Sequence, residues 1–112
     1  MLPKNKRLNL KKDFKWVASG KKIEGDLVKI FWRPGENQEP RIGIALSSAV
    51  FKKAHDRNRA RRLVSSGFEA LYIEIVDDAN IVALPKIEVL KTGSDKVQLA
   101  LGQILKKSGL LK

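Results

Sequence analysis

Apolar residues at helical spacing predict a short helix near the start of the chain. One face of residues 10–19 is apolar, through Leu10, Phe14 and Val17. Gly20 can end this helix. The residues before it are basic and show no apolar period, so we expect residues 1–9 to form an extended, basic arm.

The same spacing predicts two further helices. Apolar residues recur at three- and four-residue intervals over residues 56–72, and Asp56 is a suitable N-cap for that helix. A third amphipathic pattern covers residues 95–107, and Gly109 follows as a C-terminal signal. Both patterns bury one side of the helix and leave the other side polar.

Strand patterns fill the intervals between these helices. Residues 26–33 alternate, with Val28, Ile30 and Trp32 on one face and the intervening residues, Phe31 among them, on the other. Residues 34–40 carry turn chemistry and predict a hairpin loop to a second strand at 41–47. Residues 79–84 are nearly all apolar, which favours a central strand.

These elements predict an α+β fold in a single domain over residues 1–112. The expected architecture is a two-layer sandwich, in which three helices pack on a small mixed sheet. No apolar run approaches the ~20 residues that a membrane-spanning helix needs. The basic N-terminus lacks the apolar segment of a secretory signal, so we expect a cytoplasmic protein.

Charge is distributed unevenly along the chain. Residues 1–62 hold 17 lysines and arginines and six acids, whereas residues 63–112 hold six of each, so the first half carries the whole net charge of +11. Such asymmetry points to nucleic acid or to an anionic membrane surface. A merely basic protein with no polyanionic partner is the less favoured alternative, because solubility alone does not require clustering.

The densest cluster lies at residues 52–62, where the long helix begins. Guanidinium groups bind phosphate oxygens in pairs and stay charged at cellular pH, and a helix N-terminus adds free N–H groups. We therefore expect a polyanion-binding surface, and we expect phosphate or sulfate to stabilise the free protein against the repulsion of these charges. The candidate RNA-binding residues are Lys52, Lys53, Arg57, Asn58, Arg59, Arg61 and Arg62.

Catalytic chemistry has few candidates in this chain. There is no cysteine, so a disulfide framework and a thiolate zinc site are excluded. His55 is the only histidine, and a lone histidine beside a helix start is typical of a surface or capping residue. No carboxylate spacing predicts a metal site, and no glycine-rich phosphate loop or nucleophile motif occurs. The residues thus indicate binding rather than catalysis.

Two tryptophans lie beside basic residues. Trp16 neighbours Lys12 and Lys15 on the first helix, and Trp32 precedes Arg33 on a strand. Either indole can stack on an unpaired base, which is how single strands are held without reading their sequence. Packing against the sheet is the alternative role for Trp32.

Several segments, in order along the chain, resemble the protein subunit of bacterial ribonuclease P. The helical Arg57-Asn58-Arg59, followed by Arg61-Arg62, is similar to that family's Arg-Asn-Arg signature. The other similar segments are Leu10-Lys11-Lys12-Asp13-Phe14, residues 41–47, residues 80–85 and residues 105–111. The sequence departs from the family pattern in two regions. Between Ser47 and the signature, Ser48-Ala49 replaces a usual lysine pair, a glycine is missing near Phe51 and the loop is one residue longer, while Lys52 and Lys53 restore the charge. In the first helix, Ala18 replaces an aromatic residue, with Trp16 close by.

The resemblance implies a ribosomal protein S5 domain 2-like fold with a left-handed βαβ crossover, against the general rule for such crossovers. It also implies that an RNA subunit, using Mg²⁺, removes the 5′ leader of precursor tRNA. The protein would dock on that RNA subunit through the signature helix and hold the leader in a cleft. No protein residue would be catalytic, no organic cofactor would be needed, and the leader cleft would involve Lys11, Lys12, Phe14 and Trp32.

Three other functions fit parts of the sequence. A ribosomal or general RNA-binding protein of similar fold would share the basic helix without any role in tRNA processing. A helix-turn-helix DNA-binding protein would need a short helix before residues 56–72, where strand-like residues stand instead. A protein-only nuclease would need a carboxylate cluster for Mg²⁺.

Overall fold

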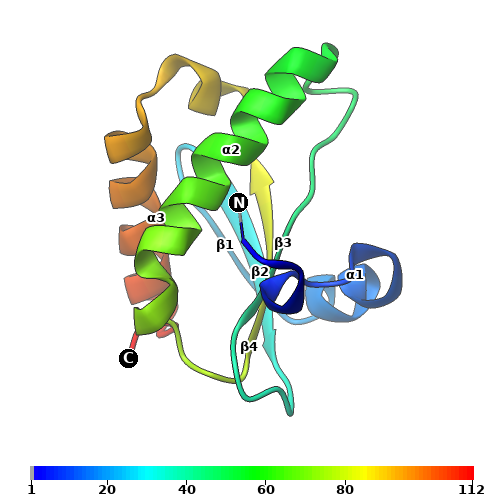
Figure 1. Cartoon of the computed structure of the whole chain (residues 1–112), viewed down its shortest axis with the longest axis vertical. Coiled ribbons are helices and arrows are strands. Elements are labelled where there is room, and N and C mark those ends of the chain that lie inside the picture. The colour runs from blue at the N-terminus through cyan, green and yellow to red at the C-terminus, as the bar shows by residue number, and fades with distance from the viewer. Residues whose placement is uncertain (1) are drawn as a thin grey trace.

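The computed structural model describes residues 2–112, in which three α-helices and four strands are joined by short 3-10 helices (Figure 1). The α-helices are α1 (Leu10–Ala18), α2 (Ala54–Leu71) and α3 (Ser94–Lys107). The strands are β1 (Lys21–Glu24), β2 (Val28–Pro34), β3 (Arg41–Ile44) and β4 (Ala79–Pro85). The 3-10 helices are η1 (Lys4–Lys6), η2 (Tyr72–Glu74) and η3 (Ile87–Lys91). None of the described helices is long and apolar enough to cross a membrane.

The sheet is mixed, with the strand order β1-β2-β4-β3. Strand β2 pairs antiparallel with both β1 and β4, while β3 and β4 are parallel. Strand β4 is therefore central, as its apolar run predicts. With α2 in front of the sheet, as in Figure 1, the chain passes from β3 to β4 on its left while both strands point upward. This is the left-handed crossover that the resemblance implies.

The hairpin predicted at residues 34–40 is wrong. Strand β4 lies between β2 and β3, so these residues connect two strands that do not pair. The hairpin is formed instead by β1 and β2, in a register that opposes Lys21 to Trp32 and Glu24 to Lys29. The sequence pattern does not predict β1, because three of its four residues are charged and exposed. An edge strand of this kind has no apolar alternation to reveal it.

The two faces of the sheet are covered differently. Helices α2 and α3 pack on one face, where Val28 and Ile30 of β2 meet the buried side of α2 in the larger core. On the other face α1 packs together with Leu8 of the N-terminal segment, around the buried Val17 and Val82. The second face consequently keeps several half-buried apolar side chains, namely Leu10, Phe14, Phe31, Ala45 and Leu84.

The N-terminal segment is not the extended arm that the sequence predicts. Leu2 and Leu8 are buried, and the turn η1 lies between them. The Leu2 N–H donates to Ser65 Oγ of α2 (3.3 Å), and the Leu8 N–H donates to the Ile42 carbonyl of β3 (3.1 Å). Two separated leucines in a basic segment form no apolar period, so the sequence does not predict that the segment is ordered. In the structure these two residues attach the segment to α2 and to the edge strand β3.

Helix α2 begins earlier than its apolar stripe predicts. Lys53 is the N-cap and makes no side-chain capping bond, so the cap predicted at Asp56 is wrong. Asp56 lies in the first turn, where a negative charge still favours the helix dipole. The apolar stripe begins only at the buried Ala60, which is why the pattern places the start too late.

Tyr72 joins the N-terminal segment to the loop before β3. Its hydroxyl donates to the Pro40 carbonyl (2.5 Å), and Lys6 Nζ lies 4.5 Å from the ring centroid. Burial, assisted by the charge of Glu39, raises the pKa of Tyr72 to about 12. The folded state thus favours the neutral phenol, so this contribution to stability is complete below about pH 10 and is lost as the pH rises toward 12.

The raised pKa of Tyr72 can be measured directly, because it is the only tyrosine in the chain. We expect phenolate absorbance to appear with a midpoint near 12 in the folded protein and near 10 in urea-unfolded protein. A folded-state midpoint near 10 would contradict the burial of this hydroxyl.

Candidate nucleic-acid interface

The N-terminal half of α2 projects beyond the end of the sheet (Figure 1). The loop before it is held by Phe51, which is 1% exposed in the larger core. Arg57 Nη1 donates to the Phe51 carbonyl at 2.7 Å, which ties the first turn of α2 back to this loop. The projecting helix is therefore anchored at its base, and its surface residues have a fixed arrangement.

The burial of α2 separates its basic side from its apolar side, as the sequence predicts. Ala60 and Val64 are completely buried, whereas Asn58, Arg59 and Arg62 are exposed. Arg57 and Arg61 lie half-buried on the flanks of the helix. Arg61 Nη1 donates to Asn58 Oδ1 at 3.1 Å, so Asn58 orients this guanidinium. Sequence reasoning places these residues correctly, but it does not reveal the two hydrogen bonds of the arginines.

The arginines of this helix end are paired with no carboxylate of the described residues. Among residues 2–112, no ion pair joins Arg57, Arg59, Arg61 or Arg62 to a carboxylate. Lys52 and Lys53 are exposed in the loop just before the helix. His55 is also exposed, and its Nε2 lies 3.5 Å from Asp56 Oδ1. These six cations on one helix end form a surface suited to a polyanion.

A phosphate or sulfate ion is expected to raise the thermal stability of the free protein. Anion binding offsets the repulsion within the helix end. An anion concentration of ten times the Kd would add about 1.4 kcal/mol to the free energy of unfolding. In a chain of this size that corresponds to a Tm increase of roughly 5 °C. Chloride at the same ionic strength is the control for screening. In an Arg59→Ala/Arg62→Ala variant, phosphate or sulfate should raise the Tm no more than chloride does. An extra Tm increase that persists in this variant would contradict the assignment.

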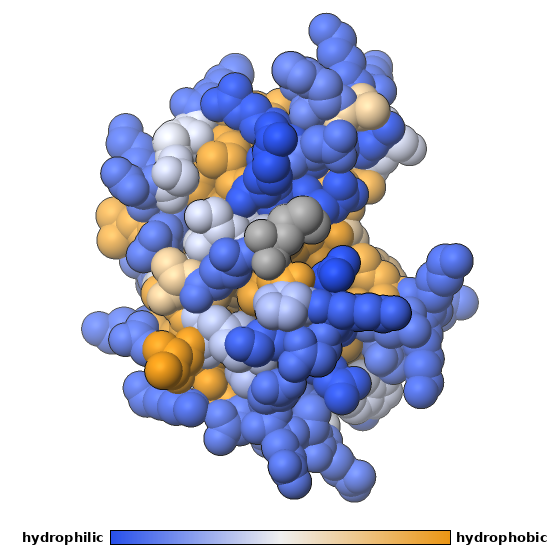
Figure 2. Space-filling model, viewed as in Figure 1, coloured by the Kyte–Doolittle hydropathy of each residue, from blue (hydrophilic) through white to orange (hydrophobic). Residues whose placement is uncertain are grey.

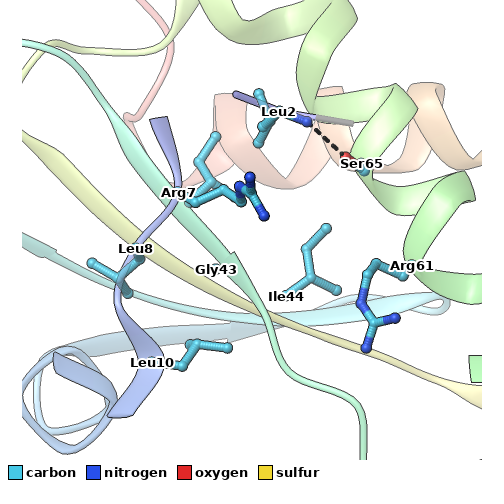
Figure 3. A pocket seen from close by; sticks show the side chains of 9 residues that line it. Leu2, Arg7, Leu8, Leu10, Gly43, Ile44, Arg61 and Ser65 are labelled. Carbon is cyan, nitrogen blue, oxygen red and sulfur yellow. Dashed lines mark hydrogen bonds between the residues drawn. The ribbon is translucent and has the colours of Figure 1, made fainter. Parts of the chain in front are cut away.

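A cleft with a volume of about 340 Å³ extends the basic surface toward the N-terminal segment. Figure 3 shows Arg7 from that segment and Arg61 from α2 on either side of Ile44. In Figure 2 the apolar floor of this hollow lies between two hydrophilic masses, α2 above and the N-terminal segment below. Gly43 lets the Leu10 side chain lie close to the backbone of β3, because a Cβ at this position would lie 2.6 Å from Leu10 Cδ2. The sequence does not predict that Arg7 joins Arg61 at one cleft.

The face of the sheet that α1 covers, here called the open face, carries a second candidate surface, which is aromatic. Phe14 of α1 and Phe31 of β2 are half-buried in the same small cluster, beside Leu84 of β4. Lys29 Nζ lies 5.1 Å from the Phe31 ring centroid. Lys11 is exposed one helical turn before Phe14. This face therefore presents apolar rings with flanking cations, a combination suited to single-stranded RNA.

The four residues predicted for the leader cleft do not lie together. Lys11 and Phe14 adjoin the open face, but Lys12 lines a different cleft on α1, next to Trp16. Trp32 points to the opposite face of the sheet, where it packs against the larger core. The alternation of β2 predicts that Trp32 and Phe31 face opposite ways, but it does not say which face the helices cover. Phe31, rather than Trp32, is the aromatic residue of β2 that lies on the same face as Phe14.

The described residues offer no metal centre. Within residues 2–112, no three side chains of histidine, aspartate or glutamate come together as ligands for a metal ion.

Comparisons with known proteins agree with this geometry. Residues 2–109 match the family model for Ribonuclease P. The chain is 40% identical over 75 residues to the ribonuclease P protein component of Legionella pneumophila (strain Corby), and the match spans 66% of each chain. The protein component of Photorhabdus laumondii is 28% identical over 106 residues, covering 94% of this chain and 88% of the relative.

The fold matches solved structures of the same family. The RNase P protein from Thermotoga maritima superposes with a TM-score of 0.81 at 27% identity, covering 89% of this chain and 97% of that structure. A mutant RNase P protein from Staphylococcus aureus gives a TM-score of 0.86, with 96% of this chain and 92% of that structure covered. Its 18% identity supports the fold alone. With the family model matching nearly the whole chain, the protein belongs to the ribonuclease P protein family.

Proposed function

We propose that this protein is the protein subunit of a ribonuclease P ribonucleoprotein. It docks on the RNA subunit through the basic end of α2 and assists removal of the 5′ leader from precursor tRNA in the cytoplasm. The observation that carries the proposal is the anchored helix end with its exposed Arg59 and Arg62, in a chain of this family. The cleft between Arg7 and Arg61 extends the same docking surface.

The contribution of the protein is electrostatic and positional. Bringing a precursor tRNA against an RNA subunit opposes two phosphate backbones, and cations on a fixed surface lower that repulsion. We assign no catalytic role to any side chain of this chain. Mg²⁺ would be held mainly by the RNA subunit, whose phosphate oxygens are ligands of the kind that this ion prefers. A protein that supplies positive charge should therefore matter most when Mg²⁺ is scarce.

The leader of the precursor would lie on the open face of the sheet. Phe14 and Phe31 offer ring surfaces for unpaired bases, while Lys11 and Lys29 offer charge to the intervening phosphates. Stacking of this kind tolerates any base, since every base has a π face. This assignment replaces Trp32 with Phe31 in the predicted cleft.

A Phe31→Leu variant should weaken recognition of the leader while keeping the apolar packing of β2. Loss of one stacked base should lower affinity by roughly 5- to 10-fold. The measurement compares the Kd of leader-bearing and leaderless tRNA with the RNA–protein complex. Trp32→Phe, on the other face of the sheet, is the matched control and should leave the ratio of the two affinities unchanged. Equal losses in both variants would argue against a leader on the open face.

Cleavage of a 5′-extended precursor tRNA tests the proposed function as a whole. The assay uses a bacterial ribonuclease P RNA, preferably cognate, at Mg²⁺ too low for the RNA alone to turn over. Addition of the protein should restore cleavage at the mature 5′ end. Tight RNA binding without any rescue would instead indicate a general RNA-binding protein of this fold.

A further inference from the structure

Trp16 is the one aromatic side chain within residues 2–112 that belongs to neither apolar core. It lies on α1 and is 39% exposed, on the side of the helix away from Phe14. The Arg33 guanidinium carbon lies 5.1 Å from the Trp16 ring centroid. Arg33 is itself held, because its Nη1 donates to the Trp16 carbonyl (3.3 Å) and to Ser19 Oγ (2.9 Å). The indole is thus oriented by a cation while a large part of it stays open to solvent.

Trp16 lines an open cleft between α1 and the loop that follows β2. The cleft has a volume of about 990 Å³, which is ample for a nucleotide. The residues that line it include two cations, Lys12 and Arg41, and two acids, Asp13 and Glu36. The lining therefore combines one aromatic ring, groups that attract phosphate, and carboxylates that accept hydrogen bonds from the edge of a base.

The far wall of this cleft is rigid. Asn80 is 5% exposed, and its Nδ2 donates to Asn37 Oδ1 (2.9 Å) and to the Arg33 carbonyl (3.3 Å). Asn37 Nδ2 in turn donates to the carbonyls of Glu39 (2.8 Å) and Ala79 (3.2 Å). Two side-chain amides thereby fix the loop opposite Trp16. A fixed wall lowers the entropy lost when a ligand is bound.

We propose that Trp16, backed by Arg33, is a stacking site for an unpaired nucleotide of single-stranded RNA, with Lys12 and Arg41 contacting the adjoining phosphates. The site lies on the opposite side of α1 from the open sheet face. A strand that crosses α1 over Lys11 and Lys12 would contact both surfaces. The inference rests on the proposed RNA-binding function and adds a second stacking site to it.

Fluorescence of Trp16 provides the test. The chain has two tryptophans, so a Trp32→Phe background leaves Trp16 as the only indole. Titration with a ten-nucleotide oligouridylate should quench Trp16 saturably, because a stacked base quenches indole emission. An oligomer of the same length with abasic sugars has the same phosphates and should bind without that quenching. Equal quenching by the abasic oligomer would overturn the stacking assignment.

Variants at Trp16 separate stacking from packing. Trp16→Leu should weaken binding of the oligouridylate roughly 10-fold, while Trp16→Phe should retain most of the affinity. The thermal unfolding of Trp16→Leu should match that of the parent. A fall in Tm with unchanged RNA affinity would show that Trp16 only packs on Arg33, and would overturn the inference.

The two proposals fail in different ways. Rescue of precursor cleavage without any quenching of Trp16 fluorescence would reject the stacking site and leave the ribonuclease P role supported. Quenching by single-stranded RNA without rescue of cleavage would support the stacking site and reject the processing role.

Discussion

A Phe51→Ala variant is expected to lose about 3–5 kcal/mol of unfolding free energy. Phe51 is 1% exposed and is among the largest fully buried side chains of the chain. Its removal leaves a cavity at the base of the projecting helix end, and folded domains have only about 5–15 kcal/mol of stability in total. Urea unfolding at fixed ionic strength measures the loss without changing electrostatic screening.

Phe51→Ala should also disturb the basic surface, because the Phe51 carbonyl accepts the 2.7 Å hydrogen bond from Arg57. The neighbouring Val50 supplies a matched control, since it is 47% exposed in the same loop. Val50→Ala should change stability by less than about 0.5 kcal/mol and leave RNA affinity unchanged. Similar losses in the two variants would mean that the loop before α2 is not anchored by Phe51.

An Arg59→Ala/Arg62→Ala variant should bind RNA roughly 50-fold more weakly at 0.1 M salt. Both arginines are exposed and, within residues 2–112, are joined to no carboxylate. If each neutralises one phosphate, the slope of log K against log salt should fall by about two units, one for each arginine. The measurement is RNA affinity over a series of salt concentrations, with thermal unfolding as a check on the fold.

Two lysines at the end of α3 give the matched control for charge. Lys106 and Lys107 are exposed, and Figure 1 places this end of α3 far from the projecting end of α2. A Lys106→Ala/Lys107→Ala variant removes the same charge but should keep the salt slope. If it flattened the slope as much as the arginine variant, general charge rather than the helix end would account for binding.

The single arginines should differ from one another. Arg59 is exposed, whereas Arg57 donates a hydrogen bond to the Phe51 carbonyl and Arg61 donates one to Asn58. In the sequence, Arg57 and Arg61 are alike candidates for RNA binding. The structure adds a stabilising role for Arg57, so effects of Arg57→Ala on RNA binding should be read together with its effect on stability.

Local patterns predict the helices and the central strand because each carries its own apolar period. Leu10, Phe14 and Val17 are enough to place α1, and the apolar run at 79–84 is enough to place β4 in the sheet interior. The order of the strands is a different matter. Strand β4, which comes much later in the chain, lies between β2 and β3. Nothing in the sequence of the 34–40 loop predicts that the two strands it connects do not pair.

The candidate site also has one part that the sequence predicts and one part that depends on tertiary packing. The basic side of α2 follows from helical geometry, so Arg59 and Arg62 are predicted correctly as exposed. The leader surface depends on which face of the sheet α2 and α3 cover, and that is decided by tertiary packing. For this reason Trp32 packs, half-buried, against the larger core, and Phe31, its neighbour in sequence, lies on the open face.

The most direct test of the docking helix is multiple-turnover cleavage of a 5′-extended precursor tRNA at low Mg²⁺, with cognate ribonuclease P RNA. The wild-type protein and the Lys106→Ala/Lys107→Ala variant should restore cleavage at the mature 5′ end. The Arg59→Ala/Arg62→Ala variant should not restore it at the same protein concentration, although excess protein should recover part of the activity. Full rescue by the arginine variant at limiting protein, with its fold intact, would contradict docking through α2.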